Sequence, residues 1–345
     1  TRYFTVRYQL YKLTNYMEHT PELEETDVYL QSMDFAHAWM LGLIPTEEIY
    51  RELMGRVNSP TRIKDITSAL DERNHSLFHS LTQKVVNRIL EIELQRGDSE
   101  TQVTRLAEEL HRVYGAETLI RILQAFGKDT FIRDSYNWRN TKRGVLSSLL
   151  HACYPSPDDD SDTLKSLASQ ADISHIRLVE AAMFAPQWLE LTEKATGWKG
   201  LESAAYYFHA HTSECFDDKK KAIIARYTPI AIEDLQEGAF DIDWFKEAYK
   251  TIGKERFEVV YNAAKYISLS NTHTRARKFA DAVNGKTKAA DAKKEIIAKR
   301  NKDLLMSYGL IPLGRKADKE LLERYQFLQK FLKESKEFGA QRQES

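Results

Sequence analysis

The C-terminal end of the chain, from Asp303 to Gly339, contains the pattern that most restricts the fold. It predicts the end of one helix, a turn at Gly309 to Pro312, and a long helix from Asp318 to Phe338. At 100° per residue, the apolar side chains of this long helix spread over roughly 220° of its circumference. A helix that lies on a two-layer surface buries only about half of that arc. We therefore expect this helix to pack against two or more neighbours.

Helix signals dominate the rest of the chain. Apolar residues recur at helical spacing between 75 and 95, and glycine or a cap followed by proline separates the segments. The pattern predicts helices over 3–13, 75–95, 99–114, 116–126 and 142–154, and a further series from 163 to the C-terminal end. Because alternating strand patterns are almost absent, the predicted fold class is all-α.

An internal similarity suggests how these helices are arranged. EELHRVYGAETLIRIL (Glu108 to Leu123) and KEAYKTIGKERFEVVY (Lys246 to Tyr261) share a helix–glycine–helix layout, and Gly-Leu-Ile-Pro occurs both at Gly42 and at Gly309. Helix pairs with tight turns are typical of HEAT-like stacks. An irregular helical-repeat solenoid is the first prediction, and a compact multi-helix bundle is the alternative.

One segment interrupts the helical pattern strongly. YPSPDDDSD, residues 154–162, has two prolines and four aspartates within nine residues, which cannot continue a regular element. It predicts a boundary between an N-terminal helical region, 1–153, and a C-terminal helical region, 163–345. A long surface loop within one continuous domain is the alternative.

Composition limits the class of protein. Fifty Lys and Arg balance 51 Asp and Glu, and a formal charge of −1 argues against a globally nucleic-acid- or membrane-binding protein. Two cysteines form no disulfide framework and fit a reducing cytosol. No apolar run approaches the roughly 18 residues of a membrane span. These features predict a cytoplasmic protein that does not span a membrane.

A family resemblance lies in the C-terminal segment. KRNKDLLMSYGLIPL (Lys299 to Leu313) and LLERYQFLQKFLKESKEFGAQRQES (Leu321 to Ser345) resemble a segment of large bacterial proteins that carry domains of unknown function 5724 and 4132. Some relatives in that group carry a WGR domain and are called molybdate-regulator-like. The resemblance implies that the chain is an interior piece of a longer protein, and it implies no catalytic residues.

Three groups of side chains resemble metal or catalytic sites weakly. His75 and His79 lie four residues apart on a predicted helix, and His211 and Cys215 have the same spacing. Neither pair has the further ligands or the base-orienting group that such sites need, so a structural role is favoured for both pairs. Asp158, Asp160 and Asp162 alternate as in a calcium loop, but the glycine and the bidentate glutamate of such a loop are missing. An acidic loop before a helix is favoured for these aspartates.

A basic segment, His273 to Lys302, is the most informative charge feature. Ten basic residues against three acids give it a net charge of +7. Such a local surface can hold phosphates or an acidic partner, although a solvated helix face is the alternative. Only Phe279 could stack on a base, which weakens a role in reading single strands. The candidate contact residues are Arg275, Arg277, Lys278, Lys293, Lys294, Lys299, Arg300 and Lys302.

No catalytic signature accompanies these features. The chain contains no glycine-rich phosphate loop, no nucleophile elbow and no CxxC pair, and the sequence predicts no cofactor. We therefore expect a non-catalytic helical interaction or scaffold region. Its partner would be a protein or other domains of the same full-length chain. The alternative is a module that binds nucleic acid or a phosphate ligand through residues 273–302, with a regulatory or DNA-damage-linked role.

Overall fold

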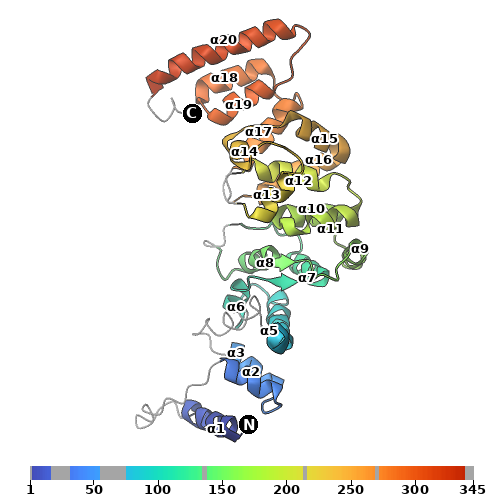
Figure 1. The fold of residues 1–345 in the computed structure, drawn as a ribbon, viewed down its shortest axis with the longest axis vertical. Helices are drawn as coiled ribbons and strands as arrows, with labels where there is room; N and C mark the ends of the chain where they lie inside the picture. Colours follow the sequence, from blue (N-terminus) through green and yellow to red (C-terminus); the bar gives the residue numbers. More distant parts are fainter. Residues whose placement is uncertain are drawn as a thin grey trace. The chain divides into compact units, whose positions relative to one another are not determined.

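The described part of the chain is almost entirely helical (Figure 1). The computed structural model describes residues 2–16, 32–54, 75–133, 138–212, 216–268 and 272–338. The chain divides into two compact units, Thr1–Ser156 and Pro157–Ser345, and the division falls inside the segment 154–162. None of the described helices is both long enough and apolar enough to cross a membrane. The predicted all-α class, a helical solenoid or bundle, is confirmed.

The first unit packs its helices around a core of aliphatic side chains, among which Ile89, Leu119 and Leu149 are fully buried. Its two strands pair in parallel, with Val113 opposite Cys153. The described elements of this unit are α1 (Arg2–Tyr16), α2 (Ser32–Met40), α3 (Thr46–Met54), α5 (His75–Leu94), α6 (Thr104–Glu108), β1 (Val113–Tyr114), α7 (Ala116–Phe126), α8 (Lys142–His151) and β2 (Cys153–Tyr154).

The second unit is a series of short helices that ends in one long helix. Its described elements are α9 (Ser161–Gln170), α10 (His175–Phe184), η2 (Pro186–Trp188), α11 (Leu189–Thr196), α12 (Leu201–Ala210), α13 (Asp218–Ile224), α14 (Ile232–Glu237), α15 (Ile242–Ile252), α16 (Lys254–Ala263), η3 (Ala264–Tyr266), α17 (His273–Val283), α18 (Ala289–Lys299), α19 (Lys302–Leu310), α20 (Ala317–Ser335) and η4 (Lys336–Phe338).

Side-chain caps fix where many of these helices begin. Asp160 accepts a hydrogen bond from the Thr163 N–H at 2.7 Å and caps α9, and Asn301 accepts from the Leu304 N–H and caps α19. A cap oxygen satisfies one of the amide donors that the first turn of a helix leaves without a partner. Polar residues at these positions therefore divide the chain into short helices.

Helix α12 lies at the centre of the second unit. Every residue from Ala204 to Ala210 is buried, and the Tyr207 ring lies 4.9 Å from the Phe245 ring of α15, measured between centroids. The Tyr207 hydroxyl donates to the Ala276 carbonyl of α17 at 2.8 Å. Because α12 is buried along almost its whole length, α11, α15, α16 and α17 pack on several of its sides.

Helices α18, α19 and α20 form a smaller layer of the second unit. Their core contains Ile296 of α18 and Tyr308 of α19, against which Phe327 and Phe331 of α20 pack. The Tyr308 and Phe327 rings meet edge to face, with centroids 5.5 Å apart. Helix α20 is thus held by one row of aromatic side chains.

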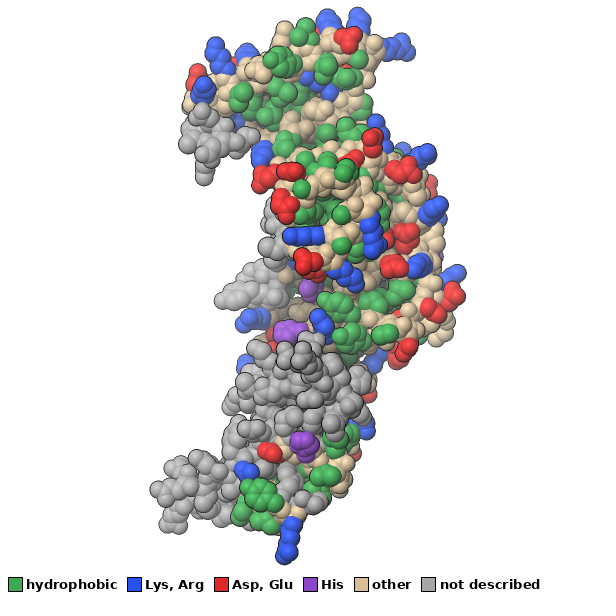
Figure 2. All heavy atoms as spheres, viewed as in Figure 1, with side chains coloured by type: hydrophobic (Ala, Val, Ile, Leu, Met, Phe, Trp, Pro, Cys, Tyr) green, Lys and Arg blue, Asp and Glu red, His purple; other side chains and the backbone are tan. Residues whose placement is uncertain are grey.

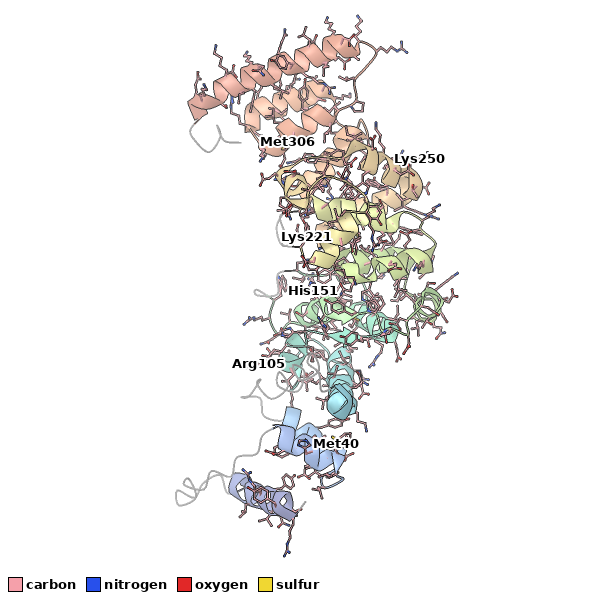
Figure 3. All side chains as sticks on the ribbon, in the orientation of Figure 1. Met40, Arg105, His151, Lys221, Lys250 and Met306 are labelled. Carbon is pink, nitrogen blue, oxygen red and sulfur yellow. The ribbon has the colours of Figure 1, made fainter. Side chains whose placement is uncertain are left out.

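The last helix has the two neighbours that the sequence predicts, but they do not bury its whole apolar arc. Helix α20 contacts both α18 and α19, but only along the side that carries Phe327 and Phe331. Tyr325 is 60 % exposed and Leu332 is 57 % exposed. Figure 3 shows side chains of α20 projecting on the side away from α18 and α19. Part of the apolar arc therefore has no neighbour among the described residues.

Three local predictions are wrong. The expected helix over 99–114 is only α6, and strand β1 precedes Gly115, so just the second copy of the internal similarity is helix–glycine–helix. Helix α8 ends at His151, before β2, and does not continue to Tyr154. Gly42 has the expected positive φ of 69°, whereas Gly309 lies inside α19, which continues to Leu310. The two Gly-Leu-Ile-Pro copies therefore end their helices differently.

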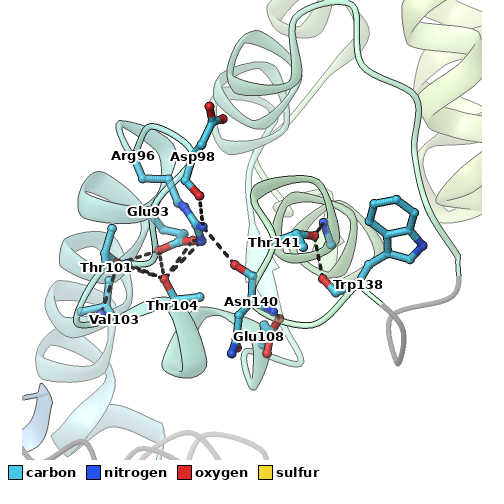
Figure 4. Close-up of polar contacts among 11 residues, drawn as sticks. Glu93, Arg96, Asp98, Thr101, Val103, Thr104, Glu108, Trp138, Asn140 and Thr141 are labelled. Carbon is cyan, nitrogen blue, oxygen red and sulfur yellow. Dashed lines mark hydrogen bonds and ion pairs between the residues drawn. The ribbon is translucent and has the colours of Figure 1, made fainter.

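A buried ion pair holds together part of the first unit (Figure 4). Arg96 Nη1 lies 2.5 Å from Glu93 Oε1, and both side chains are at most 1 % exposed. Glu93 also accepts hydrogen bonds from the hydroxyls of Thr101 and Thr104, and Arg96 donates to the Asn140 carbonyl at 3.0 Å. The two charges are therefore paired with each other and hydrogen-bonded to neighbouring groups among the described residues, except at Arg96 Nε, and the network has a structural role.

Candidate functional site

The eight basic residues predicted as a contact surface are distributed over three helices and the turn between two of them. Arg275, Arg277 and Lys278 lie on α17, and Lys293, Lys294 and Lys299 lie on α18. Arg300 follows α18, and Lys302 begins α19. Most of these side chains contact groups of their own chain.

The three arginines bind groups of their own chain. Arg275 Nε lies 2.7 Å from Asp303 Oδ1, and its Nη1 donates to the Gln236 carbonyl. Arg277 donates to the Tyr261 carbonyl at 2.9 Å. Arg300 lies over the Phe331 ring of α20, 4.6 Å from its centroid. These guanidinium groups tie helices of the second unit together, because their forked donors match carboxylate and carbonyl oxygens.

The five lysines differ in exposure. Lys294 and Lys299 are exposed, whereas Lys278, Lys293 and Lys302 are half-buried like the arginines. Lys299 is 63 % exposed and pairs with Glu295 on its own helix, while Lys302 Nζ lies 3.0 Å from Glu237 Oε2. The latter contact lowers the pKa of Glu237 through the hydrogen bond with Lys302. Lys293 lies over the rings of Tyr308 and Phe327.

A second feature of the same layer was not predicted as a site. We define the apolar patch as six large apolar side chains, each at least 40 % exposed, that lie on α20, in the turn before it, or at the start of α15. Figure 2 shows hydrophobic side chains at the surface over α18, α19 and α20. The apolar patch consists of Ile242, Leu313, Leu321, Leu322, Tyr325 and Leu332.

The apolar patch opens into a pocket of about 420 Å³. Four of its members, Ile242, Leu313, Leu321 and Tyr325, also line this pocket. Val283 of α17, Gly309 and Leu310 at the end of α19, and Leu328 of α20 complete the apolar wall, together with Ile311 and Pro312. Patch and pocket therefore form one continuous surface of the second unit.

The charged groups in the pocket wall, among the described residues, are Lys246 and Arg324. Arg324 is 7 % exposed, and its guanidinium donates to the carbonyls of Ile311 and Pro312 at 2.6 and 3.3 Å. Glu320 Oε2 lies 4.0 Å from Arg324 and accepts from the Gly314 N–H. The pocket is thus apolar with a cationic margin.

Sequence reasoning missed this surface although its signal was present. An apolar arc too wide for one neighbour indicates either several packed helices or an unfilled contact surface. The burial of Arg324 carried no such signal, because arginine is typically exposed.

Among the described residues, no three His, Cys, Asp or Glu side chains come together in a metal-binding arrangement. His75 and His79 lie on α5, but the side chains of residues 75–82 are outside the described residues, as is Cys215.

His211 is buried, with Nδ1 2.8 Å from the Tyr207 carbonyl and Nε2 3.2 Å from the Ala239 carbonyl. Asp160 is a helix cap, and its hydrogen bond from the Thr163 amide lowers its pKa.

Comparison with known proteins identifies a family. A model described as "Family of unknown function (DUF5724)" matches residues 1–345, far beyond the C-terminal segment that carried the resemblance. The association with domain 4132 and with WGR domains stays a prediction. No curated protein matches this chain, and neither does any solved structure. The chain belongs to the DUF5724 family, whose function is unknown.

Proposed function

We propose that this chain is a non-catalytic helical interaction region that binds a protein partner. The observation that carries the proposal is the apolar patch, in which Leu321, Leu322 and Tyr325 are each more than half exposed next to a pocket. Large contiguous apolar surfaces are rare on soluble proteins unless another molecule covers them. The partner is another protein or another domain of the same full-length chain, in a bacterial cytoplasm.

Burial of the apolar patch supplies the driving force for binding. Fully burying one leucine or tyrosine side chain contributes about 1.5–3 kcal/mol. Association costs the translational and rotational freedom of two molecules. Several such side chains must be buried together to offset that cost. The six members of the patch meet that requirement.

The basic segment contributes electrostatic contacts at the margin of this interaction. We assign these contacts to the lysines Lys278, Lys293, Lys294 and Lys299, because the arginines Arg275, Arg277 and Arg300 hold their own chain together. Charges at the margin of an interface raise the rate of association more than the affinity. Reversal of these lysines should therefore slow binding without unfolding the second unit.

A second candidate function is binding of nucleic acid phosphates. Its support is the local net charge of +7 over 273–302. A titration of the chain with short duplex DNA and single-stranded RNA at two salt concentrations tests it. Binding that collapses as salt rises would favour this function. We expect no binding at low salt. The arginine guanidinium groups, whose forked donors recognise phosphates, already bind groups of their own chain.

Site-directed photocrosslinking in bacterial cells tests the proposed function. A photoreactive amino acid at position 322, in the apolar patch, should crosslink a second protein. The matched control is position 176 on α10, where Ile176 is also apolar and 51 % exposed. Crosslinks from 322 and not from 176 are the expected result. Equal yields at both positions would contradict the proposal.

A further inference from the structure

Helix α20 carries a regular stripe on its exposed side. Leu321, Tyr325, Leu328 and Leu332 follow one another at spacings of four, three and four residues. This is the spacing at which one helix receives the side chains of another in a coiled-coil seam. Leu321, Tyr325 and Leu332 are each more than half exposed, whereas Phe327 and Phe331 pack against α18 and α19. It spans about 16 Å, or three helical turns.

Polar residues limit this stripe at both ends. Asp318 and Ser335 occupy the next positions of the same spacing, and each lies one step beyond the apolar run. A contact of three turns suits a short partner helix. An extended peptide is disfavoured because the described part of the second unit has no strand edge to which it could add.

The charge near the pocket favours an acidic partner. The layer of α18, α19 and α20 carries a net charge of +6 over residues 286–338, although α20 alone has four basic and four acidic residues. Lys246 and Arg324 both line the pocket, but Arg324 is buried and donates to carbonyls of its own chain. Lys246 is therefore the cation that an acidic flank on the partner would meet, and a basic flank would be repelled.

From the stripe, the pocket and the charge together, we infer that the apolar patch binds an acidic amphipathic helix of a partner protein. The partner's apolar side chains pack along Leu321, Tyr325, Leu328 and Leu332, and one of them enters the pocket. A carboxylate on the partner's flank lies beside Lys246. This inference rests on the proposed function, because it names the partner of the same surface.

Two synthetic peptides test the inference. Both have 18 residues with leucines at heptad spacing, and the remaining positions carry mainly glutamate in one peptide and mainly lysine in the other. Binding to the full chain is measured by fluorescence anisotropy. We expect the glutamate peptide to bind at least tenfold more tightly than the lysine peptide. Equal affinities, or no binding of either peptide, would overturn the inference.

Variants locate the binding. Tyr325→Ser should weaken binding of the glutamate peptide at least tenfold. Lys246→Glu should reduce the preference of the chain for the glutamate peptide over the lysine peptide. Ile176→Ser, on α10, is the matched control and should change neither affinity. Thermal unfolding of each variant checks that the fold is retained. If Tyr325→Ser folds and binds the glutamate peptide normally, the inference is wrong.

Two further outcomes separate this inference from the proposed function. If neither peptide binds but position 322 still crosslinks a protein, the assignment to an acidic helix fails and the proposed function stands. Sedimentation of the chain alone gives the other outcome. If the wild-type chain is a dimer and Tyr325→Ser is a monomer, a second copy covers the apolar patch and the inference is overturned.

Discussion

The guanidinium of Arg324 donates a hydrogen bond to the backbone carbonyl of Ile311 at 2.6 Å. This bond joins α20 to the turn that follows α19, and the same side chain reaches the Pro312 carbonyl at 3.3 Å. The guanidinium also lies over the Tyr308 ring, 5.4 Å from its centroid. One buried cation therefore orients the helix that carries most of the apolar patch.

Removal of this cation should loosen α20. Arg324→Met leaves buried carbonyl oxygens without a donor, which we expect to cost about 2–3 kcal/mol. Arg324→Lys should cost less, because it keeps the charge but lacks the forked donors. Hydrogen exchange of the α20 amides measures the effect. Protection of α20 equal to that of the wild type in Arg324→Met would contradict this role.

The buried pair of Glu93 and Arg96 should be sensitive to the loss of one partner. Arg96→Met leaves a carboxylate that is fully buried, and we expect a loss of about 3–5 kcal/mol. The double variant Glu93→Met with Arg96→Met should lose less than the sum of the two single variants. Hydrogen exchange of the α5 and α6 amides measures the loss of stability in this part of the first unit. A local measurement is preferable because a chain with two compact units need not unfold in a single step. Additive losses would show that the pair is not coupled.

His211 should make stability depend on pH. Burial lowers its pKa to about 4, against an ordinary value of 6.5. Between these values the unfolded chain binds a proton that the folded chain does not, so the free energy of unfolding falls as pH falls from about 6.5 to about 4. Over this whole pH range the free energy of unfolding should fall by about 3 kcal/mol. Above pH 6.5 His211 makes no such contribution.

His211→Phe should flatten this part of the pH profile. The ring lies among Tyr207, Phe240 and Phe279, so an aromatic replacement keeps the packing. Urea unfolding of wild type and variant at pH 7 and pH 4.5 measures the difference. His175→Gln, at an exposed position on α10, is the control and should leave the profile unchanged. Identical profiles for wild type and His211→Phe would rule out this origin of the pH dependence.

Gly238 and Met306 should prove to be coupled. Gly238 ends α14 with φ of 114°, and a Cβ atom there would collide with the thioether end of Met306 on α19. Met306 is labelled in Figure 3. Gly238→Ala should cost at least about 2 kcal/mol, from the disfavoured backbone conformation and the collision together.

Met306→Ala should relieve the collision and leave the backbone penalty. The double variant should therefore lose less than the sum of the two single losses. Thermal unfolding of the three variants checks this. A double variant that loses the full sum would show that Met306 adapts to the added methyl group without penalty.

The sequence predicted the fold class because helix periodicity and caps are local signals. Helices α5 and α7 lie close to their predicted bounds, and Asp160 caps α9 as its position before a helix suggests. The segment before Gly115 was predicted incorrectly, because pairing of Val113 with Cys153 is a contact between residues far apart in the chain. Such contacts override local helix propensity.

The candidate surface was predictable only in part. Lys278 and Arg277 are neighbours in a basic run, yet the arginine binds the Tyr261 carbonyl and the lysine is half-buried beside it. Charge counting cannot separate these two cases, since the difference depends on which carbonyls the fold brings near. The width of the apolar arc on the last helix did carry information, but it did not show which part of the arc would be left without a neighbour.

The central claim is that the apolar patch is a contact surface and not part of the core. Leu322→Ser, Tyr325→Ser and Leu332→Ser combined test it through the free energy of unfolding of the isolated chain. Because each side chain is more than half exposed, we expect the triple variant to change that free energy by less than about 1 kcal/mol. Tyr308→Ala, at a buried position of the same layer, should lose about 3–5 kcal/mol. A loss in the triple variant as large as that of Tyr308→Ala would contradict the claim, because it would mean that the patch is packed within the folded chain.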